Sequence, residues 1–337
     1  MIIVTGGAGM IGSNIIASLN DQGINDILVV DHLRNGIKMK NLMDLDIQDY
    51  LDREIFLEKI KLGYKFSSIE AVFHLGACSN TLETDGQFIM NNNYEYSKVL
   101  LHWCQAVSAQ FIYASSASVY GSAESGFKED QVSEMPLNIY AYSKYMFDQY
   151  VRCHQRELKN QVVGLRYFNV YGPREEHKTN MASTVYQFYK QIADSGVCKL
   201  FSGNDGYKNG EQMRDFIFVE DCAKVNLWFY DNREVSGIFN VGTGQARSFN
   251  DVANAVINWN IQNGNNDAKI EYIPFPSNLR GSYQTFTQAN INALRNNGYS
   301  DTFTQLEVGI TKYLNWLYTK HHQNTQLTLH YSQREVL

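Results

Sequence analysis

The stretch Ile2-Ile3-Val4-Thr5-Gly6-Gly7-Ala8-Gly9-Met10-Ile11-Gly12 opens the chain and decides which fold the sequence predicts. Its first four residues are apolar or β-branched and predict a buried strand, and residues 11–22 have the spacing of a helix. Glycines between a strand and a helix let the backbone turn tightly and approach phosphate oxygens, while the helix N-terminus presents free N–H groups. The stretch therefore predicts a binding site for the pyrophosphate of a dinucleotide, with contributions from Gly6, Gly9 and Gly12.

The first half of the chain alternates β-rich runs with helical stretches. We expect further strands at residues 27–31, 71–74, 111–115 and 162–166. We expect helices at residues 92–106 and 143–157. This alternation predicts an α/β fold, a Rossmann-type doubly wound parallel sheet with helices on both faces. Such sheets bind ligands at the carboxyl ends of their strands.

The alternation loosens in the second half, which predicts a division into two domains. We expect an NADP-binding Rossmann domain at residues 1–172, to which residues 215–245 return, and a smaller α/β substrate-binding domain at 173–214 and 246–318. Polar, aperiodic residues 319–337 predict a loosely held tail. Within the second half we expect a helix at 181–195, a loop at 202–210, strands at 215–220 and 238–241, and an extended, turn-rich segment at 271–288.

Composition excludes several classes of function. The 337 residues carry 29 Lys and Arg against 35 Asp and Glu, and a net charge of −6 argues against a nucleic-acid-binding surface. The apolar run that opens the chain is too short for a signal peptide or a membrane span. Five widely spaced cysteines without a CxxC pair predict reduced thiols in a cytoplasmic protein. His74 and His177 have no partner at metal-ligand spacing, so we expect no metal, and the chain has no GxSxG motif of a serine hydrolase.

A second motif, Tyr140-Ala141-Tyr142-Ser143-Lys144, places a phenol and an ammonium four residues apart, on one face of a helix. A free tyrosine has a pKa near 10, and we expect a nearby ammonium and a positive nicotinamide to bring it toward the working pH. Ser116 follows the strand at 111–115 and is placed to bond a substrate hydroxyl and the developing keto oxygen. These residues predict an oxidoreductase-type active site, in which Tyr140 moves protons and Lys144 holds the nicotinamide ribose.

The choice between NAD and NADP stays open at the level of the residues. Asp31 ends the second strand, where an acid bonds the ribose 2′-hydroxyl of NAD. Four basic residues nearby could instead hold a 2′-phosphate, although each taken singly is better explained as a solvated surface charge. They are Arg34, Lys38, Lys40 and Arg53.

Two polar residues near the middle of the chain are candidates for substrate contacts. Asn169 follows the strand at 162–166 and could anchor a sugar or a diphosphate. Lys178 lies just beyond it in the run Glu175-Glu176-His177-Lys178, and composition alone favours a mobile surface lysine there.

The glycine turn, Ser116 and Tyr140 with Lys144 resemble the extended short-chain dehydrogenase/reductase superfamily. The run Arg166-Tyr167-Phe168-Asn169-Val170-Tyr171-Gly172-Pro173-Arg174 is typical of its nucleotide-sugar epimerases and dehydratases. A dehydratase usually carries an acid pair at the serine strand, where this chain has Ser-Ala-Ser. The resemblance therefore implies epimerisation.

More specifically, residues 1 to about 317 resemble the ADP-L-glycero-D-manno-heptose 6-epimerases. The resemblance rests on the segments 91–98, 172–178, 181–183, 235–240 and 271–276. It implies inversion at C6″ of ADP-D-glycero-β-D-manno-heptose through a 6″-ketone, with tightly bound NADP, for the inner core of lipopolysaccharide. It also implies a homo-oligomer, a pentamer, with no membrane or nucleic-acid partner.

The same resemblance assigns roles to individual residues. Tyr140 and Lys178 match the two acid/base groups, on opposite faces of the sugar, and Ser116 and Lys144 complete the catalytic set. On the cofactor side the matches are Gly6, Gly9, Met10, Ile11, Gly12, Asp31, His32, Lys38, Arg53, Leu75, Gly76, Ala77, Cys78, Ser79, Asn92, Lys144, Val170 and Lys178. On the substrate side they are Asn169, Asn180, Gln187, Phe201, Ser202, Gly203, Asn204, Arg214 and Tyr283.

Some of these positions depart from the family pattern. His32 and Arg53 stand where the family often has Asn and Lys, and Asn180 and Gln187 replace the more usual Ser and His. Two other functions stay open: another nucleotide-sugar epimerase, such as one acting at C4 of a UDP-hexose, and a non-catalytic NADP-binding scaffold. The presence of the tyrosine and serine of the active site weighs against the scaffold, because a sensor needs the glycine turn but not the phenol.

Overall fold

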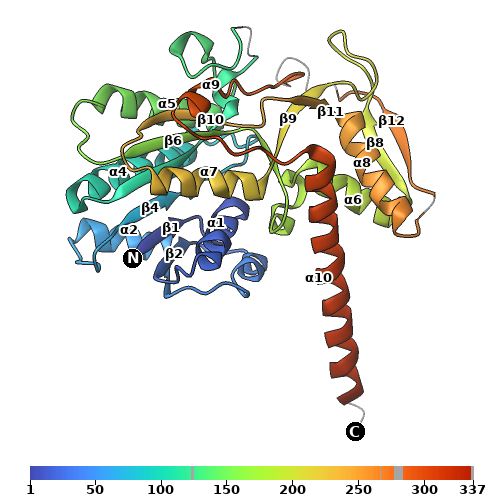
Figure 1. Cartoon of the computed structure of the whole chain (residues 1–337), viewed down its shortest axis with the longest axis horizontal. Helices are drawn as coiled ribbons and strands as arrows, with labels where there is room; N and C mark the ends of the chain where they lie inside the picture. The colour runs from blue at the N-terminus through green and yellow to red at the C-terminus, as the bar shows by residue number, and fades with distance from the viewer. Residues whose placement is uncertain (123–124, 266, 277–283, 335–337) are drawn as a thin grey trace.

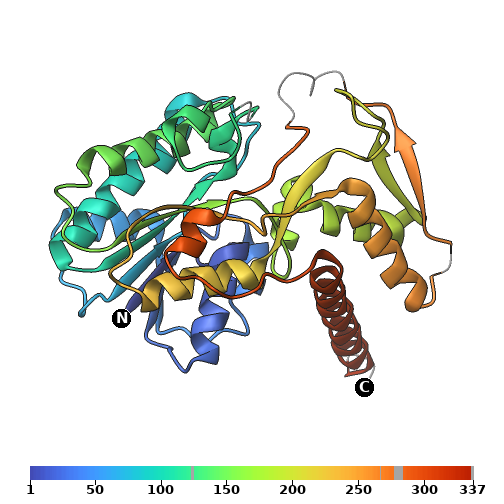
Figure 2. The same ribbon diagram turned by 45° about the horizontal axis from the view of Figure 1, so that its top comes forward.

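The structure is a computed structural model that describes residues 1–122, 125–265, 267–276 and 284–334. Figure 1 shows a large sheet with helices on both faces, a smaller group of strands and helices beside it, and helix α10 extending away from the body. Figure 2, turned by 45°, shows the same separation between the two groups. No helix among the described residues combines the length and the apolar character that crossing a membrane requires.

The large sheet has seven strands in the order β10-β6-β5-β4-β1-β2-β3, and every neighbouring pair is parallel. The strands are β1 (Ile2–Thr5), β2 (Ile27–Asp31), β3 (Asp49–Asp52), β4 (Ala71–His74), β5 (Gln110–Ser116), β6 (Val162–Tyr167) and β10 (Gly237–Val241). The predicted fold class is confirmed. Strand β3, which the sequence analysis missed, is an edge strand with the polar sequence DYLD, so it lacks the apolar run of a buried strand.

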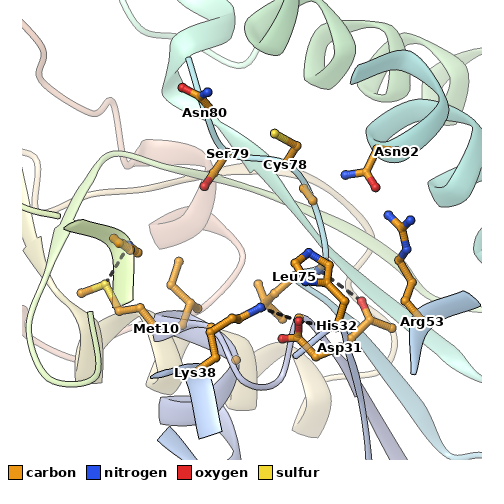
Figure 3. A pocket seen from close by; sticks show the side chains of 18 of the residues that line it. Met10, Asp31, His32, Lys38, Arg53, Leu75, Cys78, Ser79, Asn80 and Asn92 are labelled. Carbon is orange, nitrogen blue, oxygen red and sulfur yellow. Dashed lines mark hydrogen bonds and ion pairs between the residues drawn. The ribbon is translucent and has the colours of Figure 1, made fainter. Parts of the chain in front are cut away.

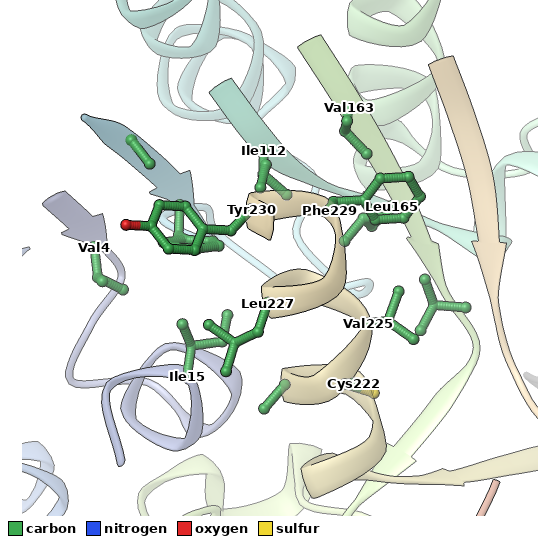
Figure 4. Packing of buried hydrophobic residues seen from close by; sticks show 14 of the residues in the cluster. Val4, Ile15, Ile112, Val163, Leu165, Cys222, Val225, Leu227, Phe229 and Tyr230 are labelled. Carbon is green, nitrogen blue, oxygen red and sulfur yellow. The ribbon is translucent and has the colours of Figure 1, made fainter. Parts of the chain in front are cut away.

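Helices cover both faces of this sheet, which explains why its central strands are continuously apolar. On one face α1 (Met10–Asp21) and α7 (Val219–Asp231) pack against each other and the strands. Figure 4 shows Leu227 and Tyr230 of α7 beside Ile15 of α1, Val4 and Ile112. The other face carries α2 (Arg53–Lys61), α4 (Tyr96–Val107) and α5 (Ile139–His154). Buried on both sides, the sheet holds its carboxyl edge as a rigid platform.

The smaller group contains two short sheets. One has the strand order β11-β9-β7 and the other pairs β12 with β8. The strands are β7 (Asn169–Tyr171), β8 (Val197–Phe201), β9 (Met213–Phe218), β11 (Ala246–Ser248) and β12 (Lys269–Ile273). Helices α6 (Thr184–Ser195), α8 (Phe249–Gln262) and α10 (Leu306–Arg334) share a second apolar core with them. Short helices α3 (Gly86–Ile89) and α9 (Asn292–Asn296) and helical turns complete the fold.

Several predicted boundaries differ from the structure, among them the end of β9, which is Phe218 and not residue 220, and the start of α6, which is Thr184 and not residue 181. Helix α5 begins at Ile139 and not at 143, because the Asn138 side chain accepts the N–H of Ala141 at 2.8 Å, so the tyrosine–lysine motif lies inside its first turns. The residues expected to form a loosely held tail are helical as far as Arg334, where α10 ends. Its buried residues recur every three or four positions up to Leu317, and the polar stretch beyond contains no Gly or Pro to end the helix.

Candidate active site

A cavity of about 440 Å³ opens at the carboxyl ends of β1, β2 and β4 (Figure 3). The structure brings together in its wall every residue expected to bind the cofactor except Val170. These are Gly6, Gly9, Met10, Ile11, Gly12, Asp31, His32, Lys38, Arg53, Leu75, Gly76, Ala77, Cys78, Ser79, Asn92, Lys144 and Lys178, and Tyr140 joins them. Val170 packs against the main core instead. The wall also contains residues that the sequence analysis did not select, among them Tyr96, His177 and Met181.

The glycine turn has the geometry that a pyrophosphate requires. Gly6 has φ +67°, and a Cβ there would lie 2.7 Å from the amide nitrogen of Gly76. A Cβ on Gly12 would lie 2.4 Å from the carbonyl oxygen of Gly6. Helix α1 begins after Gly9, which has no side chain to cap the first N–H groups. A Cβ-free cradle at an uncapped helix N-terminus fits the diphosphate of a dinucleotide.

Asp31 lies at one end of the cavity and is almost fully occupied by donors from the chain. Its carboxylate accepts the N–H of Ala8 at 2.9 Å and that of His32 at 2.7 Å, and its ion pair with Lys38 measures 2.5 Å. Arg53 lines the same end of the cavity (Figure 3). Burial, followed by the charge of Lys38, lowers the pKa of His32. Two cations, Lys38 and Arg53, line this end of the cavity, and each is also paired with a carboxylate, Lys38 with Asp31 and Arg53 with the exposed Glu54 at 3.6 Å.

Strand β5 and helix α5 meet at the catalytic residues. Tyr140 and the side chain of Ser116 are hydrogen-bonded, and one turn further on the Lys144 ammonium donates to the carbonyl of Ala114 at 2.8 Å. Burial raises the pKa of Tyr140, and the bond to Ser116 opposes that shift. The expected lowering of the tyrosine pKa is therefore wrong for the groups of the chain itself, since burial outweighs the hydrogen bond. Burial also lowers the pKa of Lys144, to about 8.

Asp148, the next residue along this face of α5, was not singled out from the sequence. Its carboxylate accepts the hydroxyls of Tyr113 and Ser115 at 2.9 Å each and the Nε–H of Arg166 at 2.9 Å. Asp148 and Arg166 are fully buried, and Glu134 forms a second ion pair with the same guanidinium at 2.6 Å. The sequence signal that could have identified Asp148 is its spacing of four residues from Lys144, which places both side chains on one face of the helix. The carboxylate ties α5 to β5 directly beneath the catalytic residues.

Lys178 enters the cavity from a different part of the fold, the turn at Glu176–Met181. Its ammonium lies 3.1 Å from the sulfur of Met10, and burial lowers its pKa while Glu175 opposes the shift. Glu175 is itself buried and accepts the N–H of Ser183 at 2.6 Å. A half-buried lysine with a lowered pKa can accept and return a proton, as the mobile surface lysine suggested by composition would not.

Two contacts hold the turn that carries Lys178 against the N-terminal part of the chain. Arg174 (φ +72°) makes a bidentate ion pair with Asp44, with both distances 2.7 Å. The amide of Asn41 donates to the carbonyl oxygens of Ala8 at 3.0 Å and of Arg174 at 2.8 Å. These contacts therefore fix the turn that carries Lys178 relative to the glycine turn between β1 and α1.

The residues expected on the substrate side do not line this cavity. Asn169 is exposed and bonds Thr287 at 3.3 Å, while Gln187 donates to the carbonyl of Thr179 at 2.8 Å, next to Lys178. Asn180 lies exposed in the same turn. Phe201, Ser202, Gly203 and Asn204 form the end of β8 and the loop after it, Arg214 is buried in β9, and Tyr283 lies outside the described residues.

Residues 1–334, with their three gaps, contain no group of three or more His, Cys, Asp and Glu side chains able to hold a metal ion. His74, considered from the sequence, is buried and hydrogen-bonded to Thr5 at 2.6 Å and Ser97 at 2.9 Å.

The fold and the cavity are those of an α/β protein with a dinucleotide site at the carboxyl ends of its parallel strands. The sequence model of the NAD dependent epimerase/dehydratase family matches residues 2–242. The chain therefore belongs to that family. The predicted enzyme class, an epimerase, is confirmed.

Within the family, particular relatives are similar along nearly the whole chain. The ADP-L-glycero-D-manno-heptose-6-epimerase of Alkalilimnicola ehrlichii is 53% identical over 314 residues, which cover 93% of this chain and 96% of that protein. The crystal structure of Helicobacter pylori ADP-L-glycero-D-manno-heptose-6-epimerase matches with a TM-score of 0.79 and 30% identity, covering 94% of this chain and 96% of its own. Thermotoga maritima UDP-glucose 4-epimerase with UDP-glucose matches with a TM-score of 0.79 and 25% identity, covering 95% and 99%. The expected resemblance to the heptose epimerases is confirmed.

Proposed function

We propose that this protein inverts C6″ of ADP-D-glycero-β-D-manno-heptose to give ADP-L-glycero-β-D-manno-heptose. The observation that carries the proposal is that Tyr140 and Lys178 reach one cavity from two separate elements. Two acid/base groups that reach the reacting carbon from different sides suit an inversion in which one group takes the proton of the hydroxyl and the other protonates the oxygen after the ketone has turned. The 53% identity with a heptose epimerase over 93% of the chain supports the choice of substrate.

Each candidate site residue has its own role in the proposed epimerisation. A nicotinamide dinucleotide, when bound, supplies the acceptor and the donor of the hydride. Lys144 holds its ribose, and the glycine turn holds its diphosphate. One of Tyr140 and Lys178 takes the proton of the C6″ hydroxyl as the ketone forms. The ketone then turns so that its other face receives the returning hydride, and the second residue gives a proton to the oxygen. The hydrogen bond from Ser116 keeps the tyrosine hydroxyl oriented throughout.

We propose NADP as the cofactor, with NAD as the poorer alternative. The support is the state of Asp31, whose carboxylate already accepts from Ala8, His32 and Lys38 and so has little capacity left for a ribose hydroxyl. Lys38 and Arg53 add positive charge at the same end of the cavity, which suits a 2′-phosphate.

Other parts of the proposal rest on the family resemblance. The residues expected on the substrate side, from Asn169 to Tyr283, contact the ADP-heptose. All except Asn169 come from the proposed substrate domain at 173–214 and 246–318. Residues 1–172 and 215–245 form the proposed cofactor domain. The enzyme acts in the cytoplasm as a homopentamer and supplies heptose for the lipopolysaccharide inner core.

A pair of substitutions tests the mechanism. Lys178→Met and Tyr140→Phe each remove one acid/base group, and each is expected to lower kcat for ADP-heptose about 10²- to 10⁴-fold. Lys190→Met, an exposed lysine on α6, is the matched control and leaves kcat unchanged. Full activity of Lys178→Met on ADP-heptose would contradict the two-group mechanism.

The second candidate is epimerisation at C4 of a UDP-hexose, favoured by the similarity to the Thermotoga maritima UDP-glucose 4-epimerase. A C4 enzyme can work with one tyrosine, because the ketone can rotate in the site. If the wild type interconverts UDP-glucose and UDP-galactose, and Lys178→Met retains that activity, the second candidate replaces the first.

A further inference from the structure

The hydroxyl of Tyr96 is a buried donor that the described residues leave without a hydrogen-bond partner. The side chain is 4% exposed and lies at the start of α4. Buried hydroxyls in native proteins are normally paired, so an unpaired one in a binding cavity points to a partner supplied by a ligand. Tyr96 is also in the wall of the cofactor cavity, although the sequence analysis did not select it.

The charged residues around Tyr96 identify the end of the cavity at which its hydroxyl lies. The charges that act on its hydroxyl are those of Arg53, Asp31 and Asp52, at the carboxyl ends of β2 and β3. Asn92, four residues earlier, lines the same cavity. Catalytic Tyr140 and Lys144 lie on α5, a different element, so Tyr96 belongs with the residues around Asp31.

The ring of Tyr96 is held in place on two sides. It packs edge-on against His74 with centroids 5.2 Å apart, and the Arg53 guanidinium lies 5.8 Å from its centroid. His74 is fixed in turn by its bonds to Thr5 and Ser97. The turn that precedes α4, Met90–Glu95, is a π-helix, a distortion frequent at functional sites. The hydroxyl is therefore preorganised rather than free to turn elsewhere.

We propose that the Tyr96 hydroxyl binds the adenine base of the cofactor, as the donor that completes the pocket between Arg53, Asn92 and Asp31. The proposal rests on the nicotinamide dinucleotide of the proposed function and extends it to a residue outside the expected cofactor set. The adenine base and the 2′-phosphate both belong to the adenosine half of the cofactor. We choose the base as the partner of the Tyr96 hydroxyl because Lys38 and Arg53 already provide cations for a phosphate.

The test measures binding of cofactor fragments and needs no turnover. Protein loaded with NADPH is competed with AMP, with adenosine 2′,5′-bisphosphate and with nicotinamide mononucleotide, and release is followed by NADPH fluorescence. Tyr96→Phe, which keeps the ring and removes one oxygen, is expected to weaken AMP and the bisphosphate equally, by about fivefold, and to leave the mononucleotide unchanged. The matched control is Tyr167→Phe, whose buried hydroxyl accepts from Asn226 at 2.7 Å outside the cavity, and it leaves all three affinities unchanged.

The remaining outcomes overturn the proposal in separable ways. Unchanged affinities in Tyr96→Phe mean that the hydroxyl contacts no part of the cofactor. Weakening of the bisphosphate alone moves the contact from the base to the 2′-phosphate. Equal weakening of all three fragments means that the substitution disturbs the whole cavity. If the wild type retains no NADPH at all, the proposed cofactor fails first, before the substitution is tested.

Discussion

Lys144 is a buried cation next to a backbone carbonyl, and its titration gives a prediction at the scale of one residue. Its pKa of about 8 lies below the ordinary lysine value. The folded chain therefore loses a proton between about pH 8 and pH 10 that the unfolded chain keeps, so this group makes the fold more stable as pH rises through that window. The charged form, to which the proposed mechanism gives the nicotinamide ribose, is lost over the same window.

We therefore expect the affinity for NADP to fall as pH rises through about 8. The measurement is the dissociation constant of NADPH between pH 7 and pH 9.5. Lys144→Arg keeps the positive charge at all these values and removes the inflection, even if its overall affinity is lower. An unchanged inflection in the arginine variant would assign the titration to another group.

A second prediction at the scale of one residue concerns Lys38 and the proposed preference for NADP over NAD. Lys38→Met frees the Asp31 carboxylate for a ribose hydroxyl and removes a cation from the cavity. We expect the affinity for NADP to fall about tenfold while that for NAD is kept or improves. Both constants are measured by fluorescence titration, with exposed Lys40→Met as the control, and a parallel loss for both cofactors would contradict the prediction.

Lys178 shows the limit of what local sequence patterns can predict about the site. Its neighbours Glu175, Glu176 and His177 are charged or polar, which indicates a surface, and only the family resemblance assigned it a role. Its burial against Met10 depends on packing between residues 168 positions apart, which no local pattern encodes. Tyr140 and Lys144 were predictable because both lie on one helix face, four residues apart.

At the scale of elements, the glycine turn between β1 and α1 gives a sharp test. Gly12→Ala forces a Cβ to within 2.4 Å of the Gly6 carbonyl, so we expect loss of cofactor binding and a lower Tm. Gly36→Ala is the matched control, since nothing lies within 4 Å of its Cβ position and its φ is ordinary. Retention of bound nucleotide by Gly12→Ala would show that the turn can open at no cost.

The contact of α5 with β5 and β6 gives a second test at this scale. Asp148→Asn removes a charge from a fully buried ion pair with Arg166, and we expect it to lower the free energy of unfolding by about 3–5 kcal/mol. Chemical denaturation measures the change, with exposed Asp21→Asn at the end of α1 as the control. A loss below 1 kcal/mol in the buried variant would mean that the network does not hold the helix.

Helices and strands with a clear periodicity of apolar residues could be predicted from the sequence, and elements without one could not. The buried strands and the helices with apolar repeats could be located from the sequence. Edge strand β3 is polar, and the end of α10 has no apolar period, so neither gives a signal. The start of α5 was set by the Asn138 cap, a local signal that the sequence analysis did not use.

At the scale of the whole molecule, catalysis depends on bringing distant parts of the chain to one cavity. Arg174 binds Asp44, and Asn41 bonds both Ala8 and Arg174, so the turn with Lys178 is held beside the glycine turn. The sequence predicted most residues that line the cavity but could not predict the two contacts of Arg174, which join residues 130 and 133 positions apart. The proposed mechanism requires the assembled site to carry its own cofactor and to need no other reactant.

The most direct measurement is therefore an NMR assay of purified protein with ADP-D-glycero-β-D-manno-heptose and no added cofactor. We expect conversion to a mixture of the two C6″ epimers, because in the proposed mechanism the cofactor stays bound and is returned unchanged. No conversion, with added NADP and NAD also failing to start the reaction, would contradict it.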